Sequence, residues 1–124
     1  MAKPGNTGFS RIVKATGYSW QGFKAAWQYE SAFRQESLLC LVLTPIAFVV
    51  GKGVTEIALL ILVLGMVLIT ELINSAIEAI VDRISDEHHP LAGRAKDLGS
   101  AAVFVSLTIV VLVWGWVGIN NHLL

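Results

Sequence analysis

TELINSAIEAIVD, residues 70–82, is the stretch that decides the fold, because it places polar groups inside the longest apolar part of the chain. On a helix that turns about 100° per residue, its polar side chains share one stripe of the surface. They are Glu71, Asn74, Ser75, Glu78 and Asp82. The rest of that helix surface is apolar, so the stripe must face protein, a cavity or a ligand rather than lipid.

The composition is that of a membrane protein. Of the 124 residues, 55% are hydrophobic and only 15% are charged, which is too apolar for a small soluble domain. The formal net charge is zero and no basic run is interleaved with aromatic residues, so we expect no nucleic-acid partner. The single cysteine, Cys40, excludes an intramolecular disulfide. The first residues lack the apolar segment of a signal peptide, so we expect the N-terminus in the cytoplasm.

Hydropathy predicts an all-α integral membrane protein with one domain, residues 1–124. We expect a surface helix over about 9–28 and three transmembrane helices over about 30–50, 54–85 and 91–120. About 20 residues suffice to cross the hydrocarbon core of about 30 Å. Pro45 should kink the first span, and Gly51-Lys52-Gly53 should form the turn after it. The second span is longer than one crossing needs, so its last turns should leave the membrane.

The expected surface helix is amphipathic. Its apolar face lies within about 60° of one direction on a helical wheel. That face consists of Phe9, Ile12, Val13, Thr16, Trp20, Phe23 and Trp27. The opposite side carries Arg11, Lys14 and Tyr18. An aromatic-rich apolar face backed by basic residues is typical of a helix in the membrane interface, and the alternative is a helix packed on a soluble core.

The basic residues predict the topology. Only Lys52 lies in the first connection between spans, and the other basic residues precede the first span or surround the second connection. They are Lys3, Arg11, Lys14, Lys24, Arg34, Arg83, Arg94 and Lys96. The positive-inside rule then places the N-terminus and the second connection in the cytoplasm and the C-terminus outside.

This topology brings polar residues of all three spans to a similar depth near the cytoplasmic face. They are Glu30, Arg34, Gln35, Glu36, Glu71, Asn74, Glu78, Lys96 and Asp97. Carboxylates and an amide supply the hard oxygen ligands that Mg²⁺ takes together with phosphate oxygens. Lys96 and Arg11 can hold phosphates as point charges. A carboxylate free of metal, Glu71 or Asp97, can take a proton from a substrate hydroxyl, so the set fits phosphoryl transfer.

Two other interpretations stay open on the residues alone. One is ion conduction or proton transfer, and the other is purely structural pairing, such as Glu71 with Lys96. The sequence has no GxxxxGK[ST] loop, no GxGxxG and no protein-kinase motif set, so a nucleotide site would be of another design. The segment Asp86-Glu87-His88-His89 lacks further spaced ligands, and we interpret it as a solvated loop rather than a metal site.

Several segments resemble the prokaryotic integral-membrane diacylglycerol kinase family. ELINSAIEAIVDR at 71–83 carries the specific pattern E-x-x-N-[ST]-A-[IV]-E, and GRAKDLGSAA follows at 93–102. GFSR at 8–11, GYSW at 17–20 and AFRQE at 32–36 are also similar to the family. The resemblance covers nearly the whole chain. It implies a homotrimer in a bacterial inner membrane, with three transmembrane helices and one surface helix per subunit and active sites shared between subunits.

The resemblance further implies that the γ-phosphate of ATP is transferred to 1,2-diacylglycerol, giving phosphatidate, with Mg²⁺ as cofactor. Glu71 corresponds to the general base, and Glu30 and Glu78 to the Mg²⁺ ligands. Asn74, Lys96 and Asp97 correspond to further catalytic residues. The positions near the nucleotide are Arg11, Tyr18, Glu30, Glu78, Glu87, His89, Lys96 and Asp97. Those near the lipid are Arg34, Gln35, Glu36, Glu71 and Ser100. For Glu87 and His89, this assignment replaces the solvated-loop interpretation.

The chain departs from the family at Thr44-Pro45 and at Gly51-Lys52-Gly53. In the family we expect an unkinked helix at the first position and an acidic turn at the second. Undecaprenol kinases share the core motif, so undecaprenol is the alternative substrate. Gly93-Arg94 and Gly99-Ser100 are closer to the diacylglycerol enzymes. A non-enzymatic trimeric conductor of ions or protons is the alternative of a different class.

Overall fold

The computed structural model describes residues 7–84 and 89–124, and it contains four helices. α1 covers Gly8–Tyr29, α2 covers Ser31–Val50, α3 covers Gly53–Ile84 and α4 covers Pro90–His122. These bounds lie within two residues of the ranges expected from the sequence. No described residue belongs to a strand, which confirms the all-α prediction for this part of the chain.

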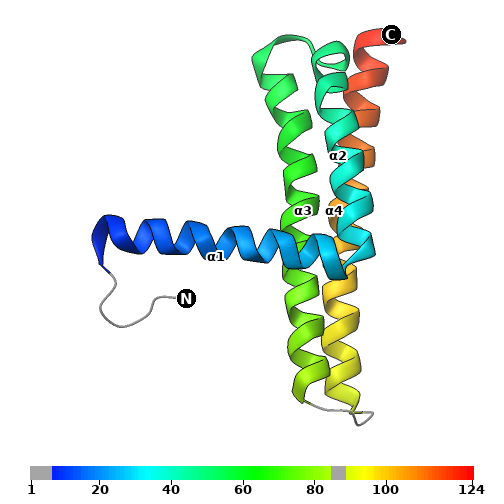
Figure 1. Ribbon diagram of the computed structural model, residues 1–124. Helices are drawn as coiled ribbons and strands as arrows, with labels where there is room; N and C mark the ends of the chain where they lie inside the picture. Colours follow the sequence, from blue (N-terminus) through cyan, green and yellow to red (C-terminus); the bar gives the residue numbers. More distant parts are fainter. Residues whose placement is uncertain (1–6, 85–88) are drawn as a thin grey trace.

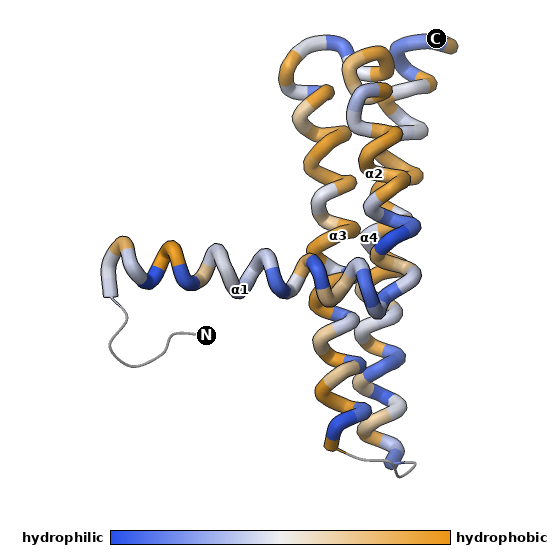
Figure 2. The backbone as a smooth tube through the Cα atoms, in the orientation of Figure 1, coloured by the Kyte–Doolittle hydropathy of each residue, from blue (hydrophilic) through white to orange (hydrophobic). Residues whose placement is uncertain are grey.

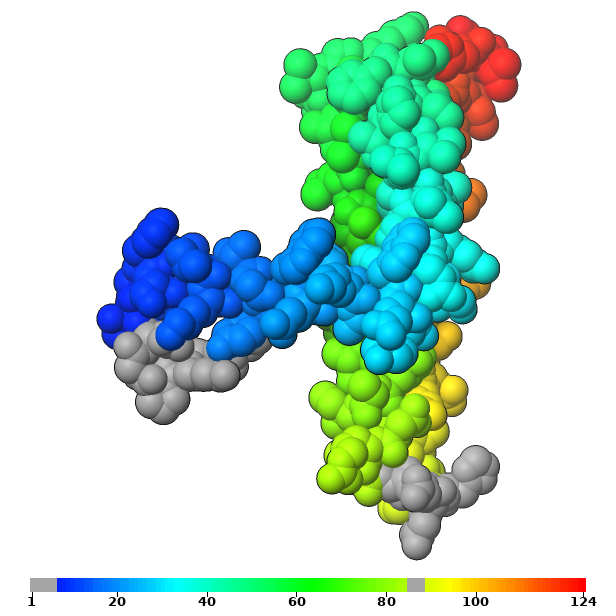
Figure 3. Space-filling view, in the orientation of Figure 1, coloured from blue at the N-terminus to red at the C-terminus, as the bar shows by residue number. Residues whose placement is uncertain are grey.

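The helices α2, α3 and α4 form a bundle, and α1 projects from it as an arm (Figure 1, Figure 3). α3 and α4 pack along each other as a long hairpin, and α2 packs against the half of it nearer the C-terminus. One residue, Glu30, separates α1 from α2. Its extended backbone, with φ −116° and ψ 102°, turns the chain between the two helices.

Three helices, α2, α3 and α4, are long and apolar enough to cross a membrane. At a rise of about 1.5 Å per residue, α2 with 20 residues measures about 30 Å, which matches the hydrocarbon core. α3 and α4, with 32 and 33 residues, are about 18 Å longer than the core. Figure 2 shows mixed hydropathy in the part of the hairpin beyond α1, where this extra length lies.

The bundle is packed most tightly near the turn between α2 and α3. Ala47, Leu60 and Val117 are buried there, one from each of the three bundle helices. Trp114 packs against this cluster, and its indole Nε1 donates a hydrogen bond to the Leu60 carbonyl oxygen at 3.2 Å. Gly51 is closely packed in the turn, because a Cβ at this position would lie 3.0 Å from Ile57 Cγ1.

A polar contact joins the same ends of the three bundle helices. The Asn121 side-chain amide of α4 donates to the Val50 carbonyl oxygen at 2.9 Å and to Glu56 Oε1 at 2.7 Å. Glu56 Oε1 also accepts a hydrogen bond from the Lys52 backbone amide at 2.9 Å. These bonds satisfy a carbonyl group at the end of α2 that has no partner within its own helix.

Hydroxyl groups inside the spans also find partners. Thr44 donates to the Cys40 carbonyl oxygen at 2.6 Å, next to Pro45, and α2 continues through that proline. Thr70 of α3 lies 3.0 Å from Ser106 Oγ of α4, and Ser106 donates to the Val103 carbonyl oxygen at 2.7 Å. Such pairing is expected where no water is present to bind polar groups.

The apolar face of α1 is not packed on a protein core. Phe9 is 80% exposed, Ile12 62% and Trp20 65%, and Ala26 is the buried residue of this helix. The single chain therefore provides no core on which the described residues of this face pack. An unbroken helix over Gly8–Tyr29 also shows that its internal glycines do not interrupt it.

Candidate active site

The polar stripe of α3 is buried at one end and exposed at the other. Glu71 is 5% exposed and Asn74 is 8% exposed, whereas the side chain of Asp82 is 65% exposed. A carboxylate and an amide in this position are expensive to bury in a membrane helix without partners. The buried end of the stripe is therefore the part that needs a functional explanation.

Asn74 of α3 lies close to Gly99 of α4. Its Nδ2 donates to Glu78 Oε1 at 3.2 Å, and its Oδ1 is buried without a hydrogen bond among the described residues. On α4, Gly99 faces this amide. A Cβ at Gly99 would overlap Asn74 Oδ1 and lie 3.2 Å from Asn74 Cγ. The missing side chain at Gly99 therefore makes room for the amide.

Carboxylates from three parts of the chain converge on Glu71. Glu30 at the junction of α1 and α2, Glu36 on α2 and Glu78 on α3 are all near enough for their charges to interact with Glu71. Glu36 Oε2 is buried without a hydrogen bond in the described part of the chain. Like charges gathered in this way repel each other, so a cation or a shared proton would stabilise the group.

The oxygen donors fit Mg²⁺. Among the described residues, no three His, Cys, Asp or Glu side chains form a complete metal site. Mg²⁺ is usually bound by only one or two protein carboxylates, together with waters and substrate phosphates. Glu30 and Glu78 supply two carboxylates near Glu71. This donor set is suited to a metal that arrives with a phosphate ligand.

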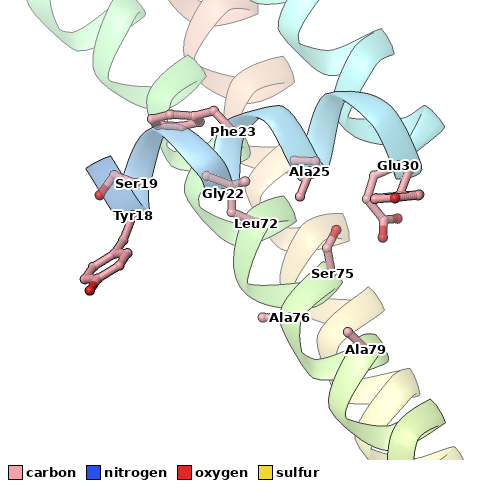
Figure 4. Close-up of a pocket in the computed structure, with 12 residues that line it drawn as sticks. Tyr18, Ser19, Gly22, Phe23, Ala25, Glu30, Leu72, Ser75, Ala76 and Ala79 are labelled. Atoms are coloured by element: carbon pink, nitrogen blue, oxygen red, sulfur yellow. The ribbon is translucent and has the colours of Figure 1, made fainter. Parts of the chain in front are cut away.

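An open groove of about 670 Å³ lies between α1 and α3 (Figure 4). Small residues such as Gly22, Ala26 and Ala76 make up much of its lining, which leaves room for a ligand. Tyr18 of α1 and Glu30, the residue that follows α1, line this groove, and both are assigned to the nucleotide by resemblance. Ser75 of α3 lies in it as well and has its hydroxyl group directed toward α1. Sequence reasoning placed Ser75 on the stripe but gave it no role.

Lys96 pairs with Asp82 and not with Glu71. Lys96 Nζ of α4 lies 2.6 Å from Asp82 Oδ1 of α3, and both side chains are substantially exposed. Structural pairing of Glu71 with Lys96 is therefore wrong for the single chain. An exposed ion pair contributes little to stability, so Lys96 can exchange Asp82 for a phosphate oxygen without a large loss.

Two expected site residues make contacts that hold helix ends. Arg34 Nη1 donates to the carbonyl oxygens of Trp27 and Gln28 at 2.7 and 3.3 Å, at the C-terminus of α1. A cation at this end of a helix also interacts favourably with the helix dipole. His89 caps α4, because its Nδ1 accepts a hydrogen bond from the Leu91 backbone amide at 3.1 Å.

Of the remaining expected residues, Arg11 is not brought to Glu71 within one chain. Arg11 lies near the far end of α1, and the 19 residues to Glu30 span about 28 Å of helix. Three others, Gln35 on α2 and Asp97 and Ser100 on α4, are exposed. Glu87 lies outside the described residues.

The comparisons with known proteins agree on one family. Residues 17–118 match the sequence profile of prokaryotic diacylglycerol kinase, which is most of the chain and includes the whole polar stripe. The chain belongs to this family. The resemblance noted in the sequence is thereby confirmed.

Named diacylglycerol kinases are similar over nearly their full length. The chain is 56% identical over 110 residues to that of Pseudomonas aeruginosa, covering 89% of each protein. It is 51% identical over 108 residues to that of Escherichia coli K12, covering 87% of this chain and 88% of the relative. The diacylglycerol kinase of Haemophilus influenzae is 49% identical over 109 residues, covering 88% and 92%.

Proposed function

We propose that this chain is a lipid kinase that transfers the γ-phosphate of ATP to the hydroxyl group of 1,2-diacylglycerol and releases phosphatidate. The observation that carries the proposal is the buried carboxylate of Glu71 with three further carboxylates near it. The family and the named relatives support the same reaction class. Lys96, the partner that structural pairing would give to Glu71, pairs with Asp82 instead.

The depth of the polar stripe suits a reaction between a lipid and a water-soluble donor. If Gly53 lies at one membrane boundary, about 20 residues of α3 cross the hydrocarbon core, and the other boundary falls near Ile73. Glu71 then lies at that boundary, where the hydroxyl group of diacylglycerol is found. Glu78, seven residues later, lies about 10 Å further toward water, where a nucleotide is accessible.

The reaction follows from these positions. The Glu71 carboxylate takes the proton of the lipid hydroxyl, and the lipid oxygen forms a bond to the γ-phosphorus of ATP. The bond between the γ-phosphorus and the bridging oxygen breaks, and ADP leaves with the electron pair of that bond. Asn74 holds Glu78 in place through its hydrogen bond at 3.2 Å. Lys96 and Asp97 of α4 complete the polar surroundings of the phosphates.

Glu30 and Glu78 would hold Mg²⁺ by their carboxylate oxygens. When bound, the ion neutralises charge on the phosphate oxygens and orients them. Of these two carboxylates, Glu30 lines the groove between α1 and α3 together with Tyr18, and both Glu30 and Tyr18 are assigned to the nucleotide. Glu36, which lies near Glu71 on α2, is then left for the lipid side of the site together with Arg34, Gln35 and Ser100.

The arrangement also supports a homotrimer with shared sites. Arg11 is about 28 Å along α1 from Glu30, so its proposed phosphate contact requires the site of another subunit. His89, also assigned to the nucleotide, lies at the start of α4, at the end of the hairpin. We place α1 in the interface of the bacterial inner membrane, with its apolar face in lipid, the N-terminus in the cytoplasm and the C-terminus outside.

The test is a transfer assay in mixed micelles. Purified protein is incubated with Mg²⁺ and ATP labelled at the γ-phosphate, with either 1,2-diacylglycerol or undecaprenol as acceptor. We expect labelled phosphatidate and little labelled undecaprenyl phosphate. Preferential labelling of undecaprenol would contradict the assigned substrate. No transfer to either lipid by well-folded protein would overturn the kinase proposal and favour a conductor, which ion flux through vesicles would then reveal.

A further inference from the structure

The hydroxyl group of Ser75 has an unusual environment. It is buried and makes no hydrogen bond within the part of the chain that the structure describes. Buried polar atoms nearly always have a partner. A serine or threonine inside a helix usually finds one at the carbonyl oxygen three or four residues earlier. Other hydroxyl groups of this chain do so, namely those of Thr16, Ser19, Thr44, Thr70, Ser106 and Thr108.

Ser75 lies on α3 between Glu71, which is proposed to act on the lipid hydroxyl group, and Glu78, which is proposed to act on the nucleotide side. It comes four residues after Glu71 and three before Glu78, which is about 6 Å and about 4.5 Å along the axis of α3. Its side chain lines the groove together with Glu30, and Figure 4 shows it pointing from α3 toward α1. A phosphoryl group that moves from a nucleotide near Glu78 to a hydroxyl group near Glu71 must pass the position of Ser75 along α3.

The surroundings of Ser75 favour a phosphate oxygen as its partner. The neighbouring polar groups of the stripe are mostly carboxylates, which repel the negative oxygens of a phosphoryl group. A neutral hydroxyl group can donate a hydrogen bond to such an oxygen without repelling it. Hydrogen bonds from fixed donors to the charge of a transition state are stronger than those between neutral groups. Ala76 and Ala79, which line the same groove beside Ser75, add no large side chain there.

We propose that Ser75 Oγ donates a hydrogen bond to a non-bridging oxygen of the phosphoryl group during its transfer. The proposal rests on the function proposed above. Ser75 keeps its proton and forms no covalent bond, so the bonds that form and break remain those between ATP and the lipid. Ser75 would thus be a phosphoryl-binding residue of the reaction, in addition to those that the resemblance assigns.

The test compares full-length wild-type protein with Ser75→Ala and Ser75→Thr in the mixed-micelle assay. We expect Ser75→Ala to lower kcat about 10- to 100-fold, the effect of losing one hydrogen bond to a charged group. The KM for diacylglycerol should stay within about twofold, because the hydroxyl group does not contact the lipid. Ser75→Thr restores a hydroxyl group and should recover most of the lost kcat. The control, Thr108→Ala, removes an exposed hydroxyl group that donates to the Phe104 carbonyl oxygen, and its kcat should be unchanged.

Thermal unfolding in detergent separates this role from a structural one. Because the Ser75 hydroxyl group has no partner in the described chain, Ser75→Ala should unfold at the same temperature as wild type or higher. A lower unfolding temperature together with lost activity would overturn the proposal, since the hydroxyl group would then hold the protein together. So would an unchanged kcat, a raised KM for diacylglycerol alone, or a Ser75→Thr variant as slow as Ser75→Ala. Wild-type protein without kinase activity would contradict the proposed function itself along with this role.

Discussion

Replacing Gly99 by alanine should damage the site through Asn74. The added Cβ would overlap Asn74 Oδ1 and lie 3.2 Å from its Cγ, and Asn74 is 8% exposed with little room to move. Adding a methyl group to a packed interior costs about 1–3 kcal/mol. If the amide turns away instead, its hydrogen bond to Glu78 is lost, which costs about 1.5–3 kcal/mol when one partner is charged.

The effects of Gly99→Ala on stability and on activity are measured by different assays. Unfolding in mixed micelles by titration with a denaturing detergent gives the loss of stability, and the transfer assay gives the loss of activity. A displacement of Asn74 that weakens the transition state by about 1.4 kcal/mol lowers kcat about tenfold. Gly115→Ala is the matched control, because it lies on the same helix and a Cβ there meets no described atom within 4 Å. Gly115→Ala should not destabilise the protein and should raise the free energy of unfolding by up to about 1 kcal/mol, because alanine favours a helix interior over glycine.

A double-mutant cycle isolates the contact between Gly99 and Asn74. In protein that already carries Asn74→Ala, the amide is absent, so Gly99→Ala should then cost less than about 0.5 kcal/mol of unfolding free energy. The coupling energy should therefore equal most of the cost of Gly99→Ala alone. An equal cost in both backgrounds, or a Gly99→Ala variant as stable as Gly115→Ala, would refute the close approach of α4 to Asn74.

Three further outcomes are expected. Glu30→Gln and Glu78→Gln should each raise the Mg²⁺ concentration for half-maximal activity, and an unchanged titration would remove that residue from the metal site. Arg34→Ala should lower the thermal unfolding temperature in detergent, because the carbonyl groups at the end of α1 lose a donor worth about 1 kcal/mol; an unchanged temperature would contradict this role. Asn121→Ala should lower the unfolding temperature but leave kcat unchanged, because the hydrogen bond from Asn121 to the Val50 carbonyl oxygen lies at the end of the bundle away from Glu71. A loss of kcat would contradict that separation.

The positions of the helices could be predicted from local patterns. Apolar runs of sufficient length indicate α2, α3 and α4, and Gly51-Lys52-Gly53 indicates the turn between the first two of them. The stripe at 70–82 also follows from helical periodicity, and burial of Glu71 and Asn74 agrees with it. These features depend on residues within one or two turns of each other, which a sequence displays directly.

Contacts between helices could not be predicted in this way. Whether Lys96 meets Glu71 or Asp82 depends on the rotation and register of α4 against α3, and no local pattern specifies either. The same holds for Gly99 opposite Asn74. Arg34 can bind the carbonyl groups at the end of α1 because Glu30, the single extended residue between α1 and α2, turns the chain there.

The Ser75 hydroxyl group illustrates a further limit. Its place on the stripe is evident from the sequence, but a serine on a helix normally satisfies itself by a local hydrogen bond. Only the atomic arrangement distinguishes it from Thr70, which donates to the Met66 carbonyl oxygen. The Ser75 hydroxyl group, which has no partner in the described chain, therefore carries no distinguishing sequence signal.

The central claim is that Glu71 acts on the lipid hydroxyl group and not on the metal. The most direct test measures labelled phosphatidate formation and binding of a nonhydrolysable ATP analogue with Mg²⁺ in the same preparations of wild type and Glu71→Gln. Removal of a general base should lower kcat by about 10²- to 10⁴-fold, while the Kd for the analogue stays within about threefold. Retained turnover in Glu71→Gln, or a strongly weakened affinity for the analogue, would contradict the assignment of Glu71 as the base.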